Sequence, residues 1–336
     1  MTQHSRTPSP HRAALARRQL PALALALGAA ALPSRARAAY PDRPVRIIVP
    51  FTPGGGSDIA ARVMSEGMAR ELGQPVIVDN KPGAGTVIGN DFVAKSAPDG
   101  YTLLLASFAF AVMPSVQPKL PYAGIGAFAP VVLIGRSPNV LLVNASRPFR
   151  GVADLLAAAR KDRGGLTYAS FGNATSAHLA GALFAHLAGV DLTHVPYRGS
   201  GPALTDLLAG RVDMLFATAA TVAGAVAGGR LRALAVTTAN RSAAYPDLPT
   251  VAEAGVPGYA AEGWYGLYAP AGTPREVIDR LNAAANQAVR AEAFQRQLAE
   301  EGLSIVGGQP AQLNEYVRAE EARWREVVRR ANITAE

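Results

Sequence analysis

Three glycine-rich stretches of this sequence each follow an apolar run and open a helical pattern. The first is Pro53 to Asp58 in VPFTPGGGSD, the second is GAGTVIG at 83–89, and the third is FGNATSAHL at 171–179. A loop that opens a helix presents unpaired backbone N–H groups at the positive end of the helix dipole, where an anion binds well. Glycine lets a ligand approach the backbone closely. The three stretches therefore predict a site for an anionic ligand.

The residue types and their spacing argue against the common phosphate-binding and catalytic motifs. No lysine follows Gly54 to Gly56, as a nucleoside triphosphate loop requires. GAGTVIG matches the dinucleotide fingerprint imperfectly, because its third glycine is displaced by one position. The sequence contains neither G-x-S-x-G nor H-E-x-x-H. We expect no catalytic residue and no cofactor.

The histidines and cysteines give no sign of a metal site. His178, His186 and His194 are the histidines that follow the N-terminal segment, and they are spaced eight residues apart, so they do not form a pair on adjacent helical turns. We expect them to be ordinary helix-face or capping residues. The chain has no cysteine, which excludes disulfides, thiolate metal ligands and a cysteine nucleophile.

Two blocks of alternating strands and helices position the glycine loops. In the first block, apolar strands at 45–51, 76–80 and 102–107 alternate with helical patterns at 57–73 and 87–98. The second block has strands at 166–170, 193–197, 212–217 and 231–238, with helices over 175–187 and 202–210. This alternation predicts parallel strands covered on both faces. Because ligands bind beyond the carboxyl ends of such strands, the loops line one cleft if the blocks face each other.

The connection between the blocks and the end of the chain have their own patterns. Residues 131–146 form two extended runs on either side of Arg136 to Asn139, which predicts a hinge or a crossing strand pair. Thr273 followed by proline and Glu276 predicts a helix start with a capping box. The last helix has an apolar stripe that Glu320 interrupts, so we expect a partly buried surface helix.

Length, charge and the first residues indicate an exported two-domain protein. The 336 residues suggest two domains. The net charge of +8 arises mostly from six arginines in residues 1–38, which leaves 27 basic against 25 acidic residues in the rest. This nearly neutral balance lacks the excess of basic residues that is typical of a nucleic-acid-binding protein. An arginine pair, an apolar stretch at 20–32 and Ala36-Arg37-Ala38 predict a signal peptide over 1–38 that is cleaved near Ala38. We leave open whether export uses the Sec or the twin-arginine route, and we expect no membrane insertion.

Long stretches of the chain resemble one known family. They include YPDRPVRIIVPFTPGGGSDIAAR, VIVDNKPGAGTVIGNDFVAKSAPDGYTLLLAS and FGNATSAHLAGALFAHLAGVDLTHVPYRGSGPALTDLLAGRVDMLFA, followed by LRALAVTTANRSAAYPDLPTVAEAGVPGY and APAGTPREVIDRLN. In this order they resemble the Bug family, the periplasmic substrate-binding proteins of tripartite tricarboxylate transporters. The resemblance extends from about Tyr40 to the last helix.

The resemblance implies an α/β fold of the two-domain periplasmic-binding-protein type (type II), with a mostly parallel sheet flanked by helices in each domain. Domain 1 would comprise 39–136 and 258–336, and domain 2 would comprise 137–257. The implied function is that of a periplasmic receptor that closes on a small carboxylate and delivers it to the membrane subunits of a tripartite tricarboxylate-type transporter. We expect a monomer with no nucleic-acid partner.

The family's two carboxylate-gripping loops match Thr52 to Asp58 and Gly172 to His178 of this sequence. The ligand-binding residues that the resemblance implies are Thr52, Gly54, Gly55, Gly56, Ser57, Asp58, Gly83, Gly85, Thr86, Gly172, Asn173, Thr175, Ser176, His178, Tyr197, Arg198 and Gly199.

Five positions need separate interpretation. Thr86 replaces a glycine that the family usually has, which would narrow its loop. Ala217 and Thr218 occupy a place where many members carry an aspartate, and contact with the ligand there stays open. A carboxylate at Asp58 would repel an anionic ligand, so we favour a structural or water-holding role for it. Arg198 would either neutralise a distal carboxylate or be a solvated rim residue.

Two other functions remain as alternatives. The first is a periplasmic ligand sensor that hands its closed form to a signalling protein. The second is a periplasmic α/β enzyme that acts on a carboxylate or a nucleotide. The absence of a paired nucleophile and base among the motifs disfavours the enzyme, and we expect a receptor without chemistry of its own.

Overall fold

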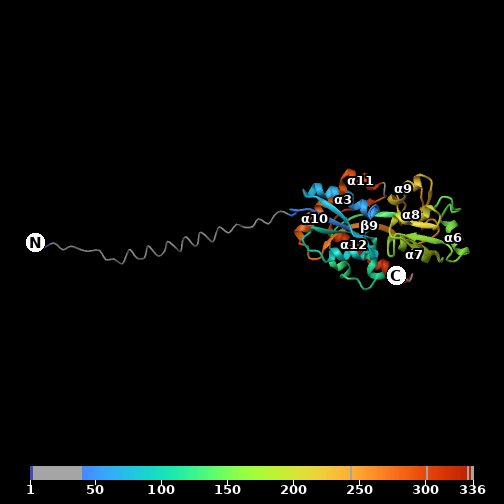
Figure 1. Cartoon of the computed structure of the whole chain (residues 1–336), viewed down its shortest axis with the longest axis horizontal. Coiled ribbons are helices and arrows are strands. Elements are labelled where there is room, and N and C mark those ends of the chain that lie inside the picture. Colours follow the sequence, from blue (N-terminus) through green and yellow to red (C-terminus); the bar gives the residue numbers. More distant parts are fainter. Residues whose placement is uncertain (3–39, 243, 300–301, 331–332, 334–336) are drawn as a thin grey trace. The chain divides into compact units, whose positions relative to one another are not determined.

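The computed structural model describes residues 1–2, 40–242, 244–299, 302–330 and 333 (Figure 1). The predicted signal peptide and its cleavage site near Ala38 lie outside the described residues, apart from residues 1 and 2. Residues Pro41–Glu336 form one compact unit. Within the described residues, no helix has the length and apolar character that crossing a membrane requires.

The first block of the sequence forms one end of the sheet system, with three parallel strands in the order β2-β1-β3. Its elements are β1 (Val45–Val49), α3 (Gly56–Leu72), β2 (Val76–Asn80), the 3₁₀ turn η3 (Ala84–Thr86), α4 (Val87–Ala94), β3 (Thr102–Ser107), α5 (Phe108–Val116) and the 3₁₀ turn η4 (Gly124–Ala127). The strands β1 and β3 are almost fully buried, as the near-continuous apolar pattern predicts for parallel strands covered on both faces.

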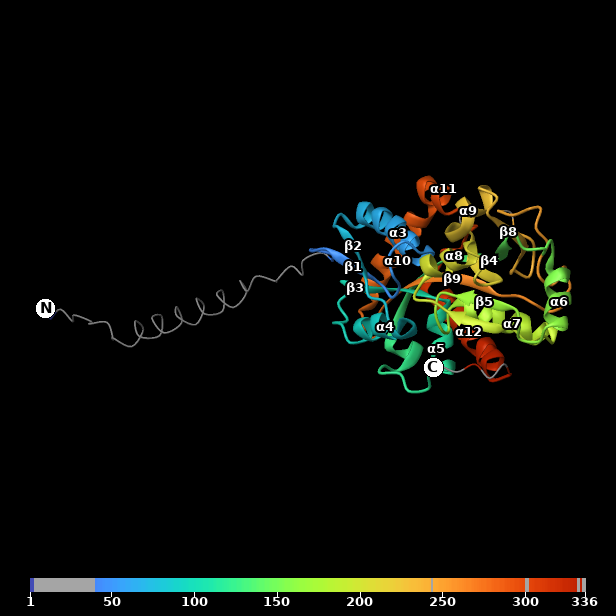
Figure 2. The same ribbon diagram turned by 45° about the vertical axis from the view of Figure 1, so that its right-hand side comes forward.

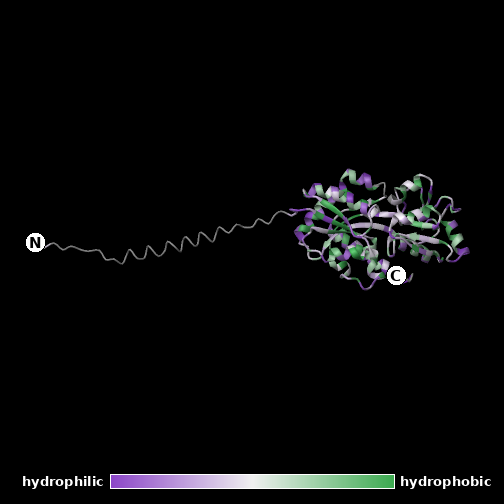
Figure 3. Cartoon of the chain, in the orientation of Figure 1, coloured by the Kyte–Doolittle hydropathy of each residue, from purple (hydrophilic) through white to green (hydrophobic). Residues whose placement is uncertain are grey.

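The second block forms the other end, again with three parallel strands, in the order β7-β5-β6. Its elements are α6 (Val152–Lys161), β5 (Thr167–Ser170), α7 (Ser176–Ala188), β6 (Thr193–Pro196), α8 (Ser200–Leu208), β7 (Met214–Thr218), α9 (Ala219–Ala227) and β8 (Leu231–Val236). The predicted alternation of strands and helices in both blocks is therefore confirmed. Hydrophobic residues gather on the strands, whereas the helices carry both hydrophobic and hydrophilic residues (Figure 3).

Two long strands, β4 (Phe128–Asn144) and β9 (Glu262–Pro270), connect the two ends (Figure 2). β4 pairs antiparallel with β9 from Phe128 to Pro138 and with β7 from Asn139 onward. Both predicted extended runs belong to β4, which continues through Arg136 to Asn139 as one strand and changes its pairing partner there. The crossing pair consists of β4 and β9, and the sequence reading did not identify β9.

The chain ends with α10 (Arg275–Arg290), α11 (Glu292–Ala299), the short strand β10 (Ser304–Ile305) and α12 (Pro310–Arg330), and these return to the first block. α10 packs closely against α3, since a Cβ on Gly67 would lie 2.6 Å from the Cβ of Ala288. α12 packs against α5 through the edge-to-face pair Phe108–Trp324, with ring centroids 4.7 Å apart.

Two predictions about these C-terminal helices need correction. α10 begins as predicted, but Pro274 is its N-cap and the Thr273 hydroxyl donates to the carbonyl of Pro270 (2.8 Å). Glu320 belongs to the buried face of α12 and does not interrupt it. The indole Nε1 of Trp324 donates to Oε2 of Glu320 at 2.8 Å, and Nη1 of Arg323 lies 3.5 Å from Oε1, so both oxygens of the buried carboxylate have a partner.

Candidate ligand-binding site

The carboxyl ends of parallel strands from both sheets meet at one cavity of about 80 Å³, here called the first cavity. In the described part of the chain, five helices begin at its wall. Their N-cap residues all line it: Gly55 of α3, Ser107 of α5, Thr175 of α7, Gly199 of α8 and Thr218 of α9. Each helix start has backbone N–H groups without an intrahelical partner and the positive end of a dipole. The convergence of these five helix starts favours the binding of an anion in the first cavity.

The first cavity has no charged wall. No Asp, Glu, Lys, Arg or His is among the described residues that line it. Aromatic rings form much of the wall, and they belong to Phe51, Phe108, Phe171, Trp264 and Tyr265. The predicted site residues that line this cavity are Thr52, Gly55, Gly56, Ser57, Thr175, Ser176 and Gly199. An anion held here would be stabilised by backbone dipoles and hydroxyls in a poorly hydrated setting.

A second cavity of about 480 Å³ adjoins the first. The two share the lining residues Phe51, Thr52, Phe171, Thr175 and Gly199. The predicted site residues that line the second cavity are Thr52, Gly83, Gly85, Thr86, Gly172, Asn173, Thr175, Tyr197, Arg198 and Gly199. The second glycine loop, 83–86, therefore faces this cavity and not the first.

Loops from the two ends of the sheet system approach each other closely across these cavities. A Cβ on Gly199 would lie 2.9 Å from Oγ1 of Thr52, and a Cβ on Gly55 would lie 3.8 Å from Oγ of Ser200. Larger residues at these glycines would hold the loops apart. Gly199 also has a φ of +115°, which side-chain-bearing residues rarely adopt.

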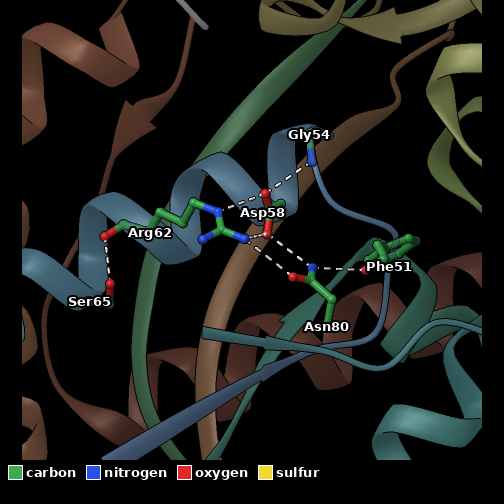
Figure 4. A network of polar contacts seen from close by, with 6 residues as sticks. All are labelled: Phe51, Gly54, Asp58, Arg62, Ser65 and Asn80. Atoms are coloured by element: carbon green, nitrogen blue, oxygen red, sulfur yellow. Dashed lines mark hydrogen bonds and ion pairs between the residues drawn. The ribbon is translucent and has the colours of Figure 1, made fainter. Parts of the chain in front are cut away.

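Asp58 lines neither cavity. Its hydrogen bonds hold the first loop in place (Figure 4). Its Oδ2 accepts from the backbone N–H of Gly54 (3.0 Å) and from Nε of Arg62 (2.9 Å). Its Oδ1 accepts from Nη2 of Arg62 and from Nδ2 of Asn80, both at 3.0 Å. The same amide nitrogen of Asn80 donates to the carbonyl of Phe51 at 3.0 Å. The network fastens the loop to α3 and β2, in line with the structural role favoured for Asp58.

The hydrogen bonds in this network decide the charge of Asp58. Burial would raise the pKa of the carboxyl group, but the donors on Arg62, Gly54 and Asn80 outweigh burial and lower the pKa below its ordinary value. Asp58 is therefore a carboxylate near neutral pH, paired with Arg62 rather than with a ligand.

His178 supports the third loop from behind and lines neither cavity. Its Nδ1 accepts from the backbone N–H of Ala174 (3.2 Å). Its ring stacks on His194, whose Nε2 lies 2.7 Å from Oγ of Ser170. Sequence reasoning missed this Ser–His pair. Ser170 is fully buried, and its Oγ is also bonded to Gly172, so the hydroxyl cannot reach a ligand.

Backbone strain is concentrated in the same loops. Three non-glycine residues have a positive φ among the described residues: Ala84 (48°), Thr86 (88°) and Ala174 (59°). Such conformations persist only where the surroundings impose them, and they cluster at ligand sites. Thr86 is buried, and its Oγ1 accepts from Nδ2 of Asn90 at 3.2 Å.

Several lining residues were not predicted. Ser107 and Thr218 end the strands β3 and β7, and the rule that ligands bind beyond the carboxyl ends of parallel strands would have identified both. The sequence left open whether Ala217 and Thr218 contact the ligand. Thr218 lines the first cavity, and its Oγ1 lies 2.9 Å from Oγ1 of Thr221. Ala217 is fully buried and does not line the cavity. Trp264 and Tyr265 belong to β9.

Trp264 has a donor that the protein leaves unused. Its ring is fully buried, and Nε1 has no hydrogen-bond partner among the described residues. By contrast, no three histidine or acidic side chains in the described ranges come together as metal ligands would.

Comparisons with known proteins agree with this architecture. Residues 60–333 match the tripartite tricarboxylate transporter family receptor. Protein BugT of Bordetella pertussis is 38% identical over 86% of this chain and 90% of its own. The structure of Rhodopseudomonas palustris Rpa4515 with adipate has a TM-score of 0.84 and 37% identity, covering 88% of this chain and 99% of that one. The structure of MatC from the same organism, with bound malate, has a TM-score of 0.81 and 33% identity, covering 86% of this chain and 100% of that one.

These similarities confirm the two-domain periplasmic-binding-protein fold and the resemblance to Bug proteins. The match covers most of the chain and includes the helix starts that surround the first cavity, apart from that of α3. The chain belongs to the family of tripartite tricarboxylate transporter receptors.

Proposed function

We propose that this protein is a periplasmic receptor that binds a small carboxylate in the first and second cavities. The observation that carries the proposal is the convergence of five helix N-termini, from both ends of the sheet system, on a cavity whose described lining has no charged side chain. Two relatives with the same fold were solved with adipate and with malate, which supports a carboxylate as the ligand class.

The carboxylate binds through backbone N–H groups and free hydroxyls. Ser57, Ser176 and Ser200 line the first cavity, and their side chains make no hydrogen bond with the described residues. Hydrogen bonds to an ionised acceptor are stronger than those between neutral groups, most of all where water is excluded. Fixed donors of this kind hold a carboxylate without a counter-ion.

Capture involves closure of two domains, 39–136 with 258–336 against 137–257. The close approach of Thr52 to Gly199 and of Gly55 to Ser200 supports a closed arrangement of the loops. A ligand that contacts both sides shifts an equilibrium between open and closed forms toward the closed form. The membrane subunits of a tripartite tricarboxylate-type transporter then recognise the closed monomer.

The receptor performs no chemistry on its ligand. Ser170 is fully buried behind the third loop and its hydroxyl is bonded to Gly172 and His194, and Asp58 is paired with Arg62. Export precedes function, and we expect the mature chain to begin near Ala39. Intact-mass measurement of the exported protein checks the cleavage site.

Thermal unfolding of the exported protein against carboxylates, amino acids, nucleotides and sugars tests the proposal. A ligand at about 100 times its dissociation constant stabilises by about 2.7 kcal/mol, which raises Tm by several degrees in a chain of this size. Gly55 lines the first cavity and has a φ of −88°, so Gly55→Val fills the cavity without backbone strain and should abolish the Tm shift. Gly224 on α9 has open space around it, so the control Gly224→Ala should retain the shift. A shift with nucleotides and with no carboxylate rejects the proposal.

A further inference from the structure

The side chain of Asn139 is buried without a hydrogen-bond partner. Asn139 lies on β4 and is fully buried. Neither its Oδ1 nor its Nδ2 has a partner among the described residues, and no other described side chain has two buried polar atoms that are both unpaired. Native proteins pair nearly all buried polar groups, because an unpaired group loses its bonds to water and gains none. The unpaired carboxamide therefore raises the free energy of this arrangement of the chain.

The backbone of Asn139, by contrast, is fully bonded. Its N–H donates to Oγ1 of Thr237 at 2.9 Å, and its carbonyl accepts from the N–H and from Oγ1 of Thr237, both at 2.9 Å. Asn139 is also the residue at which β4 leaves β9 and begins to pair with β7. These bonds fix the residue at the crossing between the two ends of the sheet system.

The carboxamide of Asn139 lies on the face of the sheet that the first cavity occupies. Asn139 is the direct partner of Thr218 in the β4–β7 ladder, and directly opposed residues of antiparallel strands place their side chains on one face. Thr218 lines the first cavity, whereas Asn139 lines neither cavity. A Cβ on Gly56, at the start of α3, would lie 3.3 Å from Oγ1 of Thr218. The start of α3, from the first block, therefore meets Thr218, from the second block, beside Asn139.

We infer that Asn139 opposes closure of the receptor and keeps the ligand-free form open. The inference rests on the closure of two domains in the proposed function. When the two ends move apart, the start of α3 withdraws from Thr218, and water reaches the carboxamide and bonds to it. In the closed arrangement the same carboxamide is unpaired, so closure has a cost that contacts with a ligand offset. Asn139 thus makes closure depend on the ligand, although it does not touch the ligand.

Small-angle X-ray scattering and titration calorimetry on the exported protein test this inference. Asn139→Leu keeps the number and branching of the side-chain heavy atoms and removes both polar groups. Its ligand-free radius of gyration should shift from the wild-type value toward that of the ligand-bound wild type. Its affinity for the probes malate and adipate should rise at least about fivefold, which corresponds to about 1 kcal/mol, because more of the protein is already closed. Asn139→Asp keeps the shape but makes burial more costly, so it should weaken binding.

The matched control is Tyr268→Phe, which removes another buried and unpaired polar group. Tyr268 packs against Phe110 and Phe128 and lines neither cavity. The melting temperature of this variant should rise, because an unpaired hydroxyl leaves the core. Its radius of gyration and its affinities should equal those of the wild type.

The possible outcomes separate the inference from the proposed function. An Asn139→Leu protein with the radius and the affinities of the wild type overturns the inference, and so does an equal gain of affinity in Tyr268→Phe. Tighter binding by Asn139→Asp also overturns it, and this variant decides the question if Asn139→Leu does not fold. A wild-type protein that binds carboxylates without a change of radius rejects closure and the inference but leaves carboxylate binding standing. A wild-type protein that binds no carboxylate rejects the proposed function, and the scattering of the ligand-free variants then decides the inference.

Discussion

His178 and His194 stack face to face, with ring centroids 3.8 Å apart and planes 4° from parallel. Tyr168 continues the stack, 4.9 Å from His194. Burial and the neighbouring His194 lower the pKa of His178 to about 3, and burial lowers the pKa of His194 to about 4. Both rings are therefore neutral near pH 7, which allows them to lie in contact behind the third loop.

This stack predicts loss of stability in mild acid. Because both folded pKa values lie below the ordinary 6.5, the unfolded chain takes up protons first as the pH falls. The stability that the two neutral histidines contribute is complete above about pH 6.5. It declines as the pH falls toward 4, by up to about 1.4 kcal/mol per pH unit for each histidine. Urea unfolding between pH 7.5 and 4.5 measures the slope. His194→Phe should reduce it, and His186→Gln, at an exposed position, should not. A flat wild-type profile contradicts the prediction.

The Asp58 network predicts that a residue outside the cavities affects binding. Asp58→Ala removes the acceptor for Gly54, Arg62 and Asn80, and should lower the free energy of unfolding by about 1–3 kcal/mol. Ligand affinity should fall as well, because the first loop loses its attachment. Chemical unfolding and calorimetry measure the two effects. The control is Glu321→Ala, which removes an exposed i,i+4 pair with Arg325 and should cost at most about 0.5 kcal/mol. Increased affinity in Asp58→Ala would mean that the carboxylate repels the ligand directly.

Gly56 is predicted to be necessary for the shape of the first cavity. A Cβ there would lie 2.5 Å from the hydroxyl of Tyr265 and 3.3 Å from Oγ1 of Thr218. Gly56→Ala forces the buried Tyr265 ring to move and should weaken ligand binding more than tenfold, an effect of at least about 1.4 kcal/mol. Calorimetry measures the affinity. Gly224→Ala, which meets nothing within 4 Å, should bind normally. Equal affinities in the two variants would refute the prediction.

The Glu320–Trp324 bond is predicted to affect stability without affecting binding. Glu320→Ala leaves the buried indole N–H unpaired and should lower the free energy of unfolding by about 1–3 kcal/mol. The ligand affinity of the folded protein should be unchanged, because neither residue lines the cavities. Glu315→Ala, at an exposed position of the same helix, is the stability control. A loss of ligand affinity under conditions in which the variant is fully folded would contradict the prediction that this bond affects stability and not binding.

The sequence predicted the parts of the site that depend on local chemistry. Glycine loops after apolar strands identified the starts of α3 and α7, because a strand, a turn and a helix N-terminus are adjacent in the chain. The resemblance to known receptors added the loop at Tyr197 to Gly199. The set of site residues as a whole remains a prediction.

What the sequence did not reveal depends on contacts between distant segments. β9 was missed because Gly263 and Gly266 interrupt its aromatic residues, although strands are enriched in residues such as Trp264 and Tyr265. The contact of Tyr265 with the start of α3 follows only from the fold. The His178–His194 stack joins residues on α7 and β6, and no spacing rule along a single element predicts it.

The continuity of β4 has a mechanical consequence. The same strand is hydrogen-bonded to β9 up to Pro138 and to β7 from Asn139. The two ends of the sheet system are therefore connected by a paired ribbon and not by a slack linker. Rotation of one end against the other has to bend and twist this ribbon, so the motion has a restoring force. In the proposed closure, the ribbon would resist this twist and take up part of the binding free energy.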